Sequence, residues 1–381
     1  MRLRYNIKNI LIFLVAGVMI CSIFDRSMLS SKLGLGGALE NIITLLIILM
    51  FLISIIFSGH TRNEWLWLFC GLIIGIIIYH YIHAREYILF VLELFSLNQF
   101  SPKLFLKISI ISITIGLALL YVMVILGLIP NTVYFRDYIA RYSLGTQHPL
   151  IFSGYIFLMS VAITFLNLNS ERNKKILCSI ILVFLIFLLS CFTKARNDEL
   201  SILFCLIVLW VDKIKKQVLQ KITFILSILF PLLIVFSIFI TNVLSYNSNS
   251  YPFWNWLFSG RLNMQNELLQ NYSIPLWGQD IPQTGGFSTS LMHYFYIDNS
   301  YARFLFMGGI IFFVFIILTI MIKILQLNNK KLSVLAIMML IIGLNGIFSD
   351  NFSIFYSSLL MPLYFISSDK YIAEFDNDHK M

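Results

Sequence analysis

Long apolar stretches alternate with short polar segments along the whole chain. Most of these stretches hold about 18 or more residues, enough for an α-helix to cross a hydrocarbon core about 30 Å thick. Because they are continuous rather than alternating with a period of two, they predict helices and exclude an outer-membrane β-barrel. About twelve spans are predicted, at residues 8–24, 42–58, 66–82, 85–97, 104–129, 150–168, 176–193, 199–213, 222–244, 300–324, 332–348 and 353–368.

The fourth predicted span, 85–97, differs from the others. It is short and carries Arg85, Glu86 and Glu93, so we expect a tilted or interfacial segment. The count matters because the loss of one span would reverse the orientation of every later one.

The composition supports a membrane protein. The chain is 59% hydrophobic and only 12% charged, whereas soluble domains contain about 25% charged residues. A soluble enzyme, a secreted disulfide scaffold and a coiled coil are therefore excluded, and we expect a single all-α transmembrane domain over 1–381. The five cysteines lie in or beside apolar spans and form no CxxC pair, which favours buried small side chains over metal or disulfide roles.

The net charge of +9 reflects topology. The basic residues form short clusters between spans rather than one stripe, so no nucleic-acid partner is expected. The first 21 residues are basic and then apolar without a small-x-small cleavage site, which predicts an uncleaved first helix. With that N-terminus inside, cytoplasmic segments hold about twice as many lysines and arginines as outer ones. Both termini are then cytoplasmic.

Lysine predominates in the predicted cytoplasmic segments and arginine in the outer ones. Topology alone does not require this difference. The planar guanidinium offers paired donors that match phosphoryl oxygens, so the outer arginines indicate phosphate recognition.

One long polar segment, 245–298, is predicted to be a large extracytoplasmic loop between the ninth and tenth spans. A short amphipathic helix is expected after Ser259-Gly260, with Leu262, Gln265, Leu268 and Leu269 on neighbouring positions. A loop of this length is usually functional. Its tryptophans suit either the membrane interface or stacking on sugar rings. The polar tail from 368 onward is predicted to be a solvated end.

The outer basic residues are candidates for a diphosphate-binding site. The alternative is that they are interfacial anchors whose long side chains reach back to the membrane surface. Arg196 and Arg261 depart most from that alternative, because each lies in a short loop or turn that can direct it toward the others. The set comprises Arg136, Arg141, Lys194, Arg196, Arg261 and Arg303.

Two residues near the tenth span, His293 and Asp298, are candidate general bases. Imidazole titrates near neutrality, and a poorly hydrated carboxylate has its pKa raised toward neutrality. The alternative for the Asp298-Asn299-Ser300 run is a helix N-cap. His148, beside Pro149, suits either a supporting role behind the substrate-contacting residues or a simple helix start.

The sequence carries no HExxH, DxD, GxxxxGK[ST] or GxGxxG motif, so we expect no metal and no cofactor. Charge within the spans is limited to Glu93, with His80 near a span end. A transporter that relays protons would therefore have few ionisable groups within its spans.

Five short motifs occur in a distinctive order: R-x-S-L-G-x-x-H-P at Arg141–Pro149, T-K-A-R at Thr193–Arg196, S-G-R at Ser259–Arg261, P-L-W-G at Pro275–Gly278 and D-N-S-Y at Asp298–Tyr301. In this order the chain resembles the Wzy-type polysaccharide repeat-unit polymerases, members of the wider O-antigen polymerase and O-antigen ligase superfamily. The likeness extends over the whole topology, although each motif is short.

The resemblance implies a glycosyltransferase that polymerises undecaprenyl-diphosphate-linked oligosaccharides into O-antigen, capsule or exopolysaccharide. The active site would lie on the outer face of the bacterial inner membrane, with a chain-length regulator and a flippase as partner proteins. Arg196 and Arg261 would hold the diphosphate, with Arg141, Lys194 and Arg303 beside them. His148, Asn299 and Tyr301 would support the site from behind. A His-Asn pair in the ligase relatives corresponds to Asp298-Asn299 here, which leaves open whether Asp298 or His293 is the base.

Three other functions stay open at this level. A lipid-linked oligosaccharide flippase or transporter predicts internal repeats and charges near the membrane midplane, and neither is clear in the sequence. An O-antigen ligase-type transferase would use the same site with a different acceptor. A non-catalytic scaffold would need neither the outer arginines nor the long loop.

Overall fold

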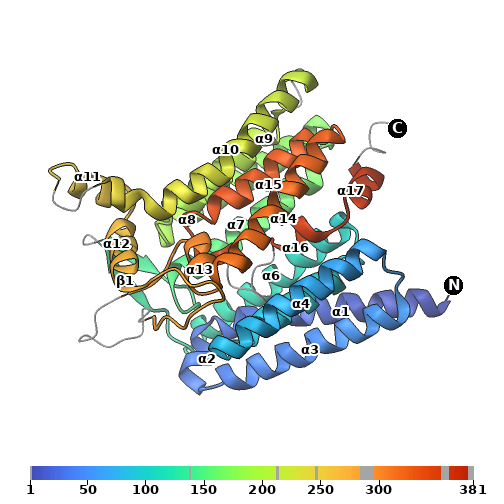
Figure 1. Ribbon diagram of the computed structural model, residues 1–381, viewed down its shortest axis with the longest axis horizontal. Helices are drawn as coiled ribbons and strands as arrows, with labels where there is room; N and C mark the ends of the chain where they lie inside the picture. The colour runs from blue at the N-terminus through green and yellow to red at the C-terminus, as the bar shows by residue number, and fades with distance from the viewer. Residues whose placement is uncertain are drawn as a thin grey trace.

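The computed structural model describes residues 2–136, 139–211, 214–244, 248–283, 295–352 and 360–375. The chain forms a bundle of helices with one small hairpin (Figure 1). The first helices are α1 (Arg2–Asp25), α2 (Met28–Leu33), α3 (Gly36–Phe57), α4 (Arg62–Ile82), α5 (Glu86–Leu97) and α6 (Pro102–Ile125). Strands β1 (Val133–Arg136) and β2 (Ile139–Tyr142) pair antiparallel and precede α7 (Pro149–Asn167), α8 (Arg172–Phe192) and α9 (Arg196–Val208). The remaining helices are α10 (Lys216–Val243), α11 (Tyr251–Leu257), α12 (Arg261–Asn271), α13 (Ser300–Phe306), α14 (Gly309–Asn329), α15 (Ser333–Asn345), α16 (Pro362–Phe365) and α17 (Ser368–Phe375), with a 3-10 turn at Asp350–Phe352.

Eight helices of the described chain are long and apolar enough to cross a membrane: α1, α3, α4, α6, α7, α8, α10 and α14. The predicted class, an all-α multi-pass membrane protein, is therefore confirmed. The number twelve stays a prediction, because α5, α9 and α15 have only 12, 13 and 13 residues.

The chain turns back and forth between two ends of the bundle. The start of α1 and helix α17 lie at one end, and the β-hairpin, α11 and α12 lie at the other (Figure 1). We call these the terminal end and the hairpin end. At the hairpin end Arg26 reaches Asp350, and at the terminal end Lys103 reaches Glu374. Such an arrangement brings turns that are far apart in sequence together at each end.

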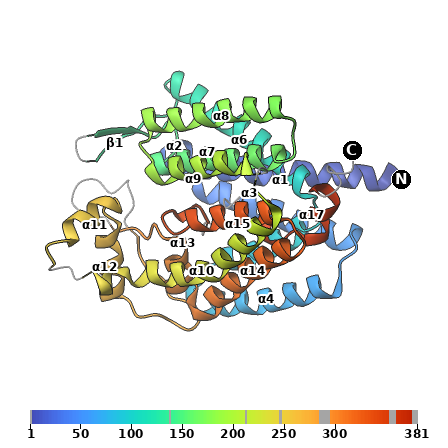
Figure 2. The same ribbon diagram turned by 90° about the horizontal axis from the view of Figure 1, so that it is seen from above.

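Burial differs sharply among the spans. In α7, 72% of the apolar window is buried, against 22% in α3 and α4. Figure 2 shows α7, α8 and α9 on one side of the molecule and α10 and α14 on the other. Helix α15 packs against both α9 and α10 and so joins the two groups. The exposed apolar faces of α3 and α4 are those a bilayer would cover.

Helix α5 is an interior helix. Nine of its twelve residues, Glu93 among them, are buried, and it packs against α3, α4 and α16. At 1.5 Å per residue it is about 18 Å long, less than the thickness of a hydrocarbon core. The Glu93 side chain is thus sheltered by protein rather than placed at the interface.

The P-L-W-G motif has a packing role. Gly278 has a φ of +116°, and a Cβ there would lie 2.6 Å from the Met307 carbonyl oxygen. The amide of Ile310 donates to the Pro275 carbonyl at 3.0 Å. The motif therefore lies across the junction between α13 and α14, and only glycine permits that approach.

The C-terminal segment corrects a prediction. Residues 368–375 form α17, in which Tyr371 and Phe375 are buried. The Glu374 carboxylate accepts from the Lys103 amide at 2.7 Å, and the Asn169 side chain donates to the Phe375 carbonyl at 3.0 Å. The prediction of a solvated end is wrong for 368–375, because apolar residues in that polar stretch pack onto the bundle. Residues 376–381 lie outside the described part.

Candidate functional site

Four of the predicted basic residues meet at the hairpin end. Arg141 comes from β2, Lys194 and Arg196 from the turn into α9, and Arg261 from the first position of α12. All four line a cavity of about 190 Å³, which we call the basic pocket. Because like charges repel, such a grouping is suited to an anionic ligand.

Local structure explains how the turn before α9 presents its side chains. The Arg141 side chain is buried, and its Nε donates to the Thr193 carbonyl at 2.6 Å. Lys194 has a φ of +53°, a backbone conformation that residues other than glycine rarely adopt. The hydrogen bond from Arg141 on β2 thus holds the turn in which Lys194 has a strained backbone. The Lys194 and Arg196 side chains of this turn are exposed.

Arg196 also contacts the long loop. Its guanidinium lies over the Trp256 ring, 5.3 Å from the centroid, a cation–π contact. Trp256 and Phe253 on α11 are more than half exposed. The aromatic stretch therefore includes a partner for Arg196 as well as apolar surface.

A second cavity, of about 270 Å³, adjoins the first and is lined mainly by apolar side chains of α10, α12 and α15. We call it the Asp298 cavity. Asp298, Asn299 and Tyr296 line it from the loop before α13, and Arg261 lines both cavities. The sequence prediction of α12 is confirmed, with Leu262, Gln265 and Leu268 buried. This packing directs Arg261 to the boundary between the cavities.

Arg261 and Asp298 form an ion pair, with 3.1 Å from Nε to Oδ2. The Nε–H itself makes no aligned hydrogen bond, and the guanidinium has only a 3.5 Å bond from Nη1 to the Phe258 carbonyl. The two side chains are 18% and 22% exposed. Most guanidinium donors of Arg261 are thus not engaged by the described residues.

The environment of Asp298 makes its carboxylate more basic than usual. Burial raises the pKa of Asp298 above its ordinary value, and it outweighs Arg261 and Arg303, which lower it. The neighbouring Asp350 carboxylate also raises this pKa. A raised pKa brings a carboxylate nearer to the range of an effective general base.

The structure separates the helix cap from the candidate base. Asn299 is the N-cap of α13, accepting from the amides of Tyr301 at 2.9 Å and Ala302 at 3.1 Å. Its side chain also donates to Ser237 on α10 at 3.1 Å. Because Asn299 provides the cap, the Asp298 carboxylate is directed to Arg261 instead.

A network that sequence reasoning missed supports this loop. Arg26, after α1, lies 3.3 Å from Asp350, which also accepts from the Tyr296 hydroxyl. Burial acts against ionisation of Asp350, but Arg26, Arg303 and the Tyr296 bond outweigh it and lower its pKa. Tyr296 is two residues from Asp298, so the network fixes the backbone beside the candidate base.

Arg303 belongs to this network and lines neither of the two cavities. Its guanidinium lies 4.9 Å from the Tyr296 ring centroid. It donates to Gln283 at 2.8 Å and to the Ile297 carbonyl at 3.3 Å. In this position it contacts the loop before α13 at Tyr296 and Ile297.

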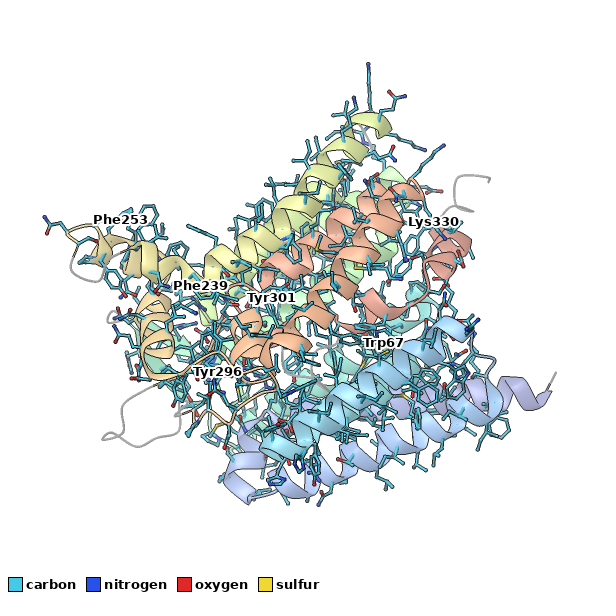
Figure 3. The ribbon with its side chains drawn as sticks, viewed as in Figure 1. Trp67, Phe239, Phe253, Tyr296, Tyr301 and Lys330 are labelled. Atoms are coloured by element: carbon cyan, nitrogen blue, oxygen red, sulfur yellow. The ribbon has the colours of Figure 1, made fainter. Side chains whose placement is uncertain are left out.

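The other predicted residues have different placements. His148 is the N-cap of α7, its Nδ1 accepting from the Leu150 amide at 3.3 Å. Burial, with Arg141 second, lowers the pKa of His148 to about 4, so it is neutral near pH 7. Tyr301 is fully buried and donates to the Gly343 carbonyl at 2.8 Å, among the helices in Figure 3. His293 lies outside the described residues, and so does the side chain of Arg136.

A second missed group holds the start of α9. The buried Asp198 accepts from Ser153 on α7 at 2.5 Å and from Asn345 on α15 at 2.9 Å. Asp198 is two residues from Arg196, so three helices share in positioning the basic pocket. The sequence signal was weak, because Asp198 reads equally well as an acidic residue in a helix first turn.

Comparisons of the chain with protein-family models, curated proteins and solved structures found no match.

Proposed function

We propose that this protein is a membrane glycosyltransferase that polymerises undecaprenyl-diphosphate-linked oligosaccharide units at the extracytoplasmic face of a bacterial inner membrane. The observation that carries the proposal is the shared position of Arg261. It lines the basic pocket with Arg141, Lys194 and Arg196, and it contacts Asp298 in the adjoining cavity. A cationic site for a leaving group thus lies beside a carboxylate with a raised pKa.

The basic pocket would bind the diphosphate of the donor lipid. When the bond between the anomeric carbon and the diphosphate oxygen breaks, the electron pair leaves with the diphosphate. Arg196 and Arg261, as cations positioned at the pocket, would stabilise that growing charge. Paired guanidinium donors suit this task better than a lysine ammonium.

Asp298 would act on the acceptor. Its carboxylate takes the proton from a sugar hydroxyl of the second lipid-linked unit, and the hydroxyl oxygen forms the new bond to the anomeric carbon. The Arg26–Asp350–Tyr296 network and Arg303 would hold the carboxylate in place. The ion pair with Arg261 would weaken as the guanidinium engages the diphosphate, which leaves the carboxylate freer to accept a proton.

The position of the charges favours a transferase over a transporter. The basic pocket lies at the hairpin end, among β2, the α8–α9 turn and α12. An alternating-access transporter would be expected to place its substrate site near the membrane midplane. A ligase-type transferase would share the same site, so the acceptor must be tested directly.

The direct test is reconstitution of the purified protein in liposomes with a lipid-linked single repeat unit. A polymerase converts it to a ladder of lipid-linked oligomers. A ligase leaves it unchanged until a separate acceptor is supplied, and a flippase moves it across the bilayer without changing its mass. Either of the last two results would reject the proposal.

Conservative variants test the basic pocket in the same assay. Arg196→Lys and Arg261→Lys keep the charge but lose the planar fork, so we expect a large loss of polymer from both. Arg85→Lys is the matched control, because Arg85, in the turn between α4 and α5, is exposed and pairs with the exposed Glu40 of α3. Normal polymer from both pocket variants would remove these residues from the site.

The orientation can be tested separately. Ser248 lies in the long loop, and Ser248→Cys in a cysteine-free background should react with a membrane-impermeant thiol reagent in intact spheroplasts. Labelling only after lysis would place the site in the cytoplasm.

A further inference from the structure

A third cavity lies at the terminal end, and none of its lining residues lines either cavity at the hairpin end. It has a volume of about 600 Å³, larger than either cavity at the hairpin end. Helices α4 and α14 form its walls, and α5 with the α16–α17 link closes it from behind. We call it the inner groove. Among its lining residues are Asn63, Trp67, Phe95, Lys323, Gln326 and Ser367.

Lys323 provides a buried positive charge in the inner groove. It is 6% exposed, and its ammonium donates to the Ile366 carbonyl at 2.6 Å and to the Ser368 hydroxyl at 3.2 Å. Both acceptors are neutral, and no carboxylate of the described residues forms an ion pair with Lys323. A lysine ammonium has three protons. The Tyr371 ring centroid lies 6.0 Å from Lys323 Nζ, and the third proton has no oxygen or nitrogen acceptor among the described residues, so it can donate to a ligand.

The other charged side chains that line the groove each have a partner of their own. Lys330 pairs with Asp369 at 2.5 Å. Glu64 accepts from the Asn98 side chain at 2.6 Å and from the Thr61 amide at 3.0 Å. Both carboxylates are thus engaged, and Lys323 is the charged side chain of the groove that keeps a donor for an anionic group.

Trp67 adds a second donor without an acceptor. Its ring stacks on Phe315, with centroids 5.7 Å apart, and meets the edge of Phe365 at 4.8 Å. Its indole N–H is buried, and no described residue accepts from it. Buried polar groups usually have a hydrogen-bond partner. Trp67 lines the groove, so a ligand bound there is a candidate acceptor for this N–H. Figure 3 shows Trp67 on α4 and Lys330 near the end of α14.

The walls of the groove indicate where such an anion comes from. Phe69 on α4 and Leu318 and Ile322 on α14 are each more than half exposed. These apolar surfaces are those expected to contact lipid tails, and Ile322 also lines the groove. A membrane lipid can therefore enter sideways with its tails against these faces and its headgroup between the helices.

We propose that the inner groove binds an anionic phospholipid from the leaflet at the terminal end, with Lys323 and Trp67 donating to its phosphate oxygens. This site is independent of the transferase proposal. It shares no residue with the basic pocket or the Asp298 cavity, so each can fail without the other.

Native mass spectrometry of the full-length, delipidated protein in detergent tests the site. The probe is dihexanoyl phosphatidylglycerol, titrated against dihexanoyl phosphatidylcholine. We expect one saturable phosphatidylglycerol, bound more tightly than phosphatidylcholine. Trp67→Phe keeps the aromatic packing but removes the N–H, and Lys323→Gln removes the charge. A charge-assisted hydrogen bond to phosphate implies roughly tenfold weaker binding in each.

Two further variants keep the result decisive if Lys323→Gln folds poorly. Thr319→Trp fills the groove without changing its charge and should abolish binding. Lys221→Gln, an exposed residue near the start of α10 at the same end, should leave binding unchanged. Unchanged binding in both Trp67→Phe and Thr319→Trp would overturn the site. Competition by inorganic phosphate at equal concentration would instead identify a free-anion site and reject the lipid.

Discussion

Two arginine–aspartate pairs lie at the hairpin end and have opposite properties. Arg26 meets Asp350 at 3.3 Å, and Arg261 meets Asp298 at 3.1 Å. The charges are the same and the distances nearly so. The pKa of Asp350 is nevertheless lowered, whereas that of Asp298 is raised.

The difference arises from the number of partners. Burial acts against ionisation in both carboxyl groups. At Asp350 it is outweighed by Arg26, by Arg303 and by the Tyr296 hydroxyl. At Asp298 the attraction of Arg261 does not offset burial, and Asp350 itself adds repulsion. Asp350 has several partners that stabilise its charge, so we interpret the Arg26–Asp350 pair as a structural contact. Asp298 has one ion-pair partner among the described residues, so its carboxylate can still accept a proton.

The largest expected effect separates the two aspartates by activity. Asp298→Asn removes the proposed base, so the rate of polymerisation should fall by between about 10² and 10⁴-fold at unchanged protein abundance. The cap is unaffected, because Asn299 provides it. Rates come from the liposome assay. If Asp298→Asn is active and His293→Gln is not, the role belongs to His293.

For the free energy of unfolding, we expect the larger effect at the Arg26–Asp350 pair. Asp350→Ala leaves Arg26 buried without its carboxylate, and we expect a loss of about 3 kcal/mol in the free energy of unfolding. Thermal unfolding of the purified protein in detergent measures this. The double variant Arg26→Met/Asp350→Leu should lose less than the sum of the single variants. Strict additivity would show that the two side chains are not coupled.

The pH dependence should have opposite signs. Asp350 has a lowered pKa in the folded state, so its stabilisation is present above the unfolded value and is lost as pH falls through the folded one. Asp298 has a raised pKa, so its contribution to stability declines as pH rises from the unfolded value to the folded one. Polymerisation, which needs the ionised form, should therefore begin to fall at a higher pH than for an ordinary aspartate. Unfolding midpoints of Asp298→Asn and Asp350→Asn across acidic pH give the comparison, and equal slopes would refute it.

The smallest effect concerns a single hydroxyl. Tyr296→Phe removes one donor to Asp350 while its ring stays beneath Arg303, and we expect a loss of about 1–2 kcal/mol in stability. Tyr272→Phe is the matched control, because Tyr272 stacks on Phe295 in the same region and its hydroxyl forms no hydrogen bond with the described residues. A similar loss in both variants would argue against a specific contribution from the Asp350 contact.

The sequence predicted those elements whose pattern lies within a few neighbouring residues. The turn at Ser259-Gly260 and the spacing of Leu262 and Leu268 led to α12, and Gly260 does have a φ of +80° before its first residue. The segment 368–375 was misjudged, since its two buried aromatics are too few to mark a packed helix. The network at Asp350 was missed because its members belong to separate turns with no shared motif.

The sequence by itself determined that this is an all-α membrane protein, because long continuous apolar stretches are stable only as helices in a bilayer. It also indicated that Arg196, Arg261 and Asp298 belong to turns or helix starts, whereas strand β2, which carries Arg141, was not predicted. Only the tertiary structure decided which of these residues meet. Arg26 finds Asp350 across 324 residues, and Arg303 turns to Tyr296 rather than into the basic pocket. Such pairings depend on how the helices pack side by side, and the hydrophobic period of a single helix carries no information about its neighbours.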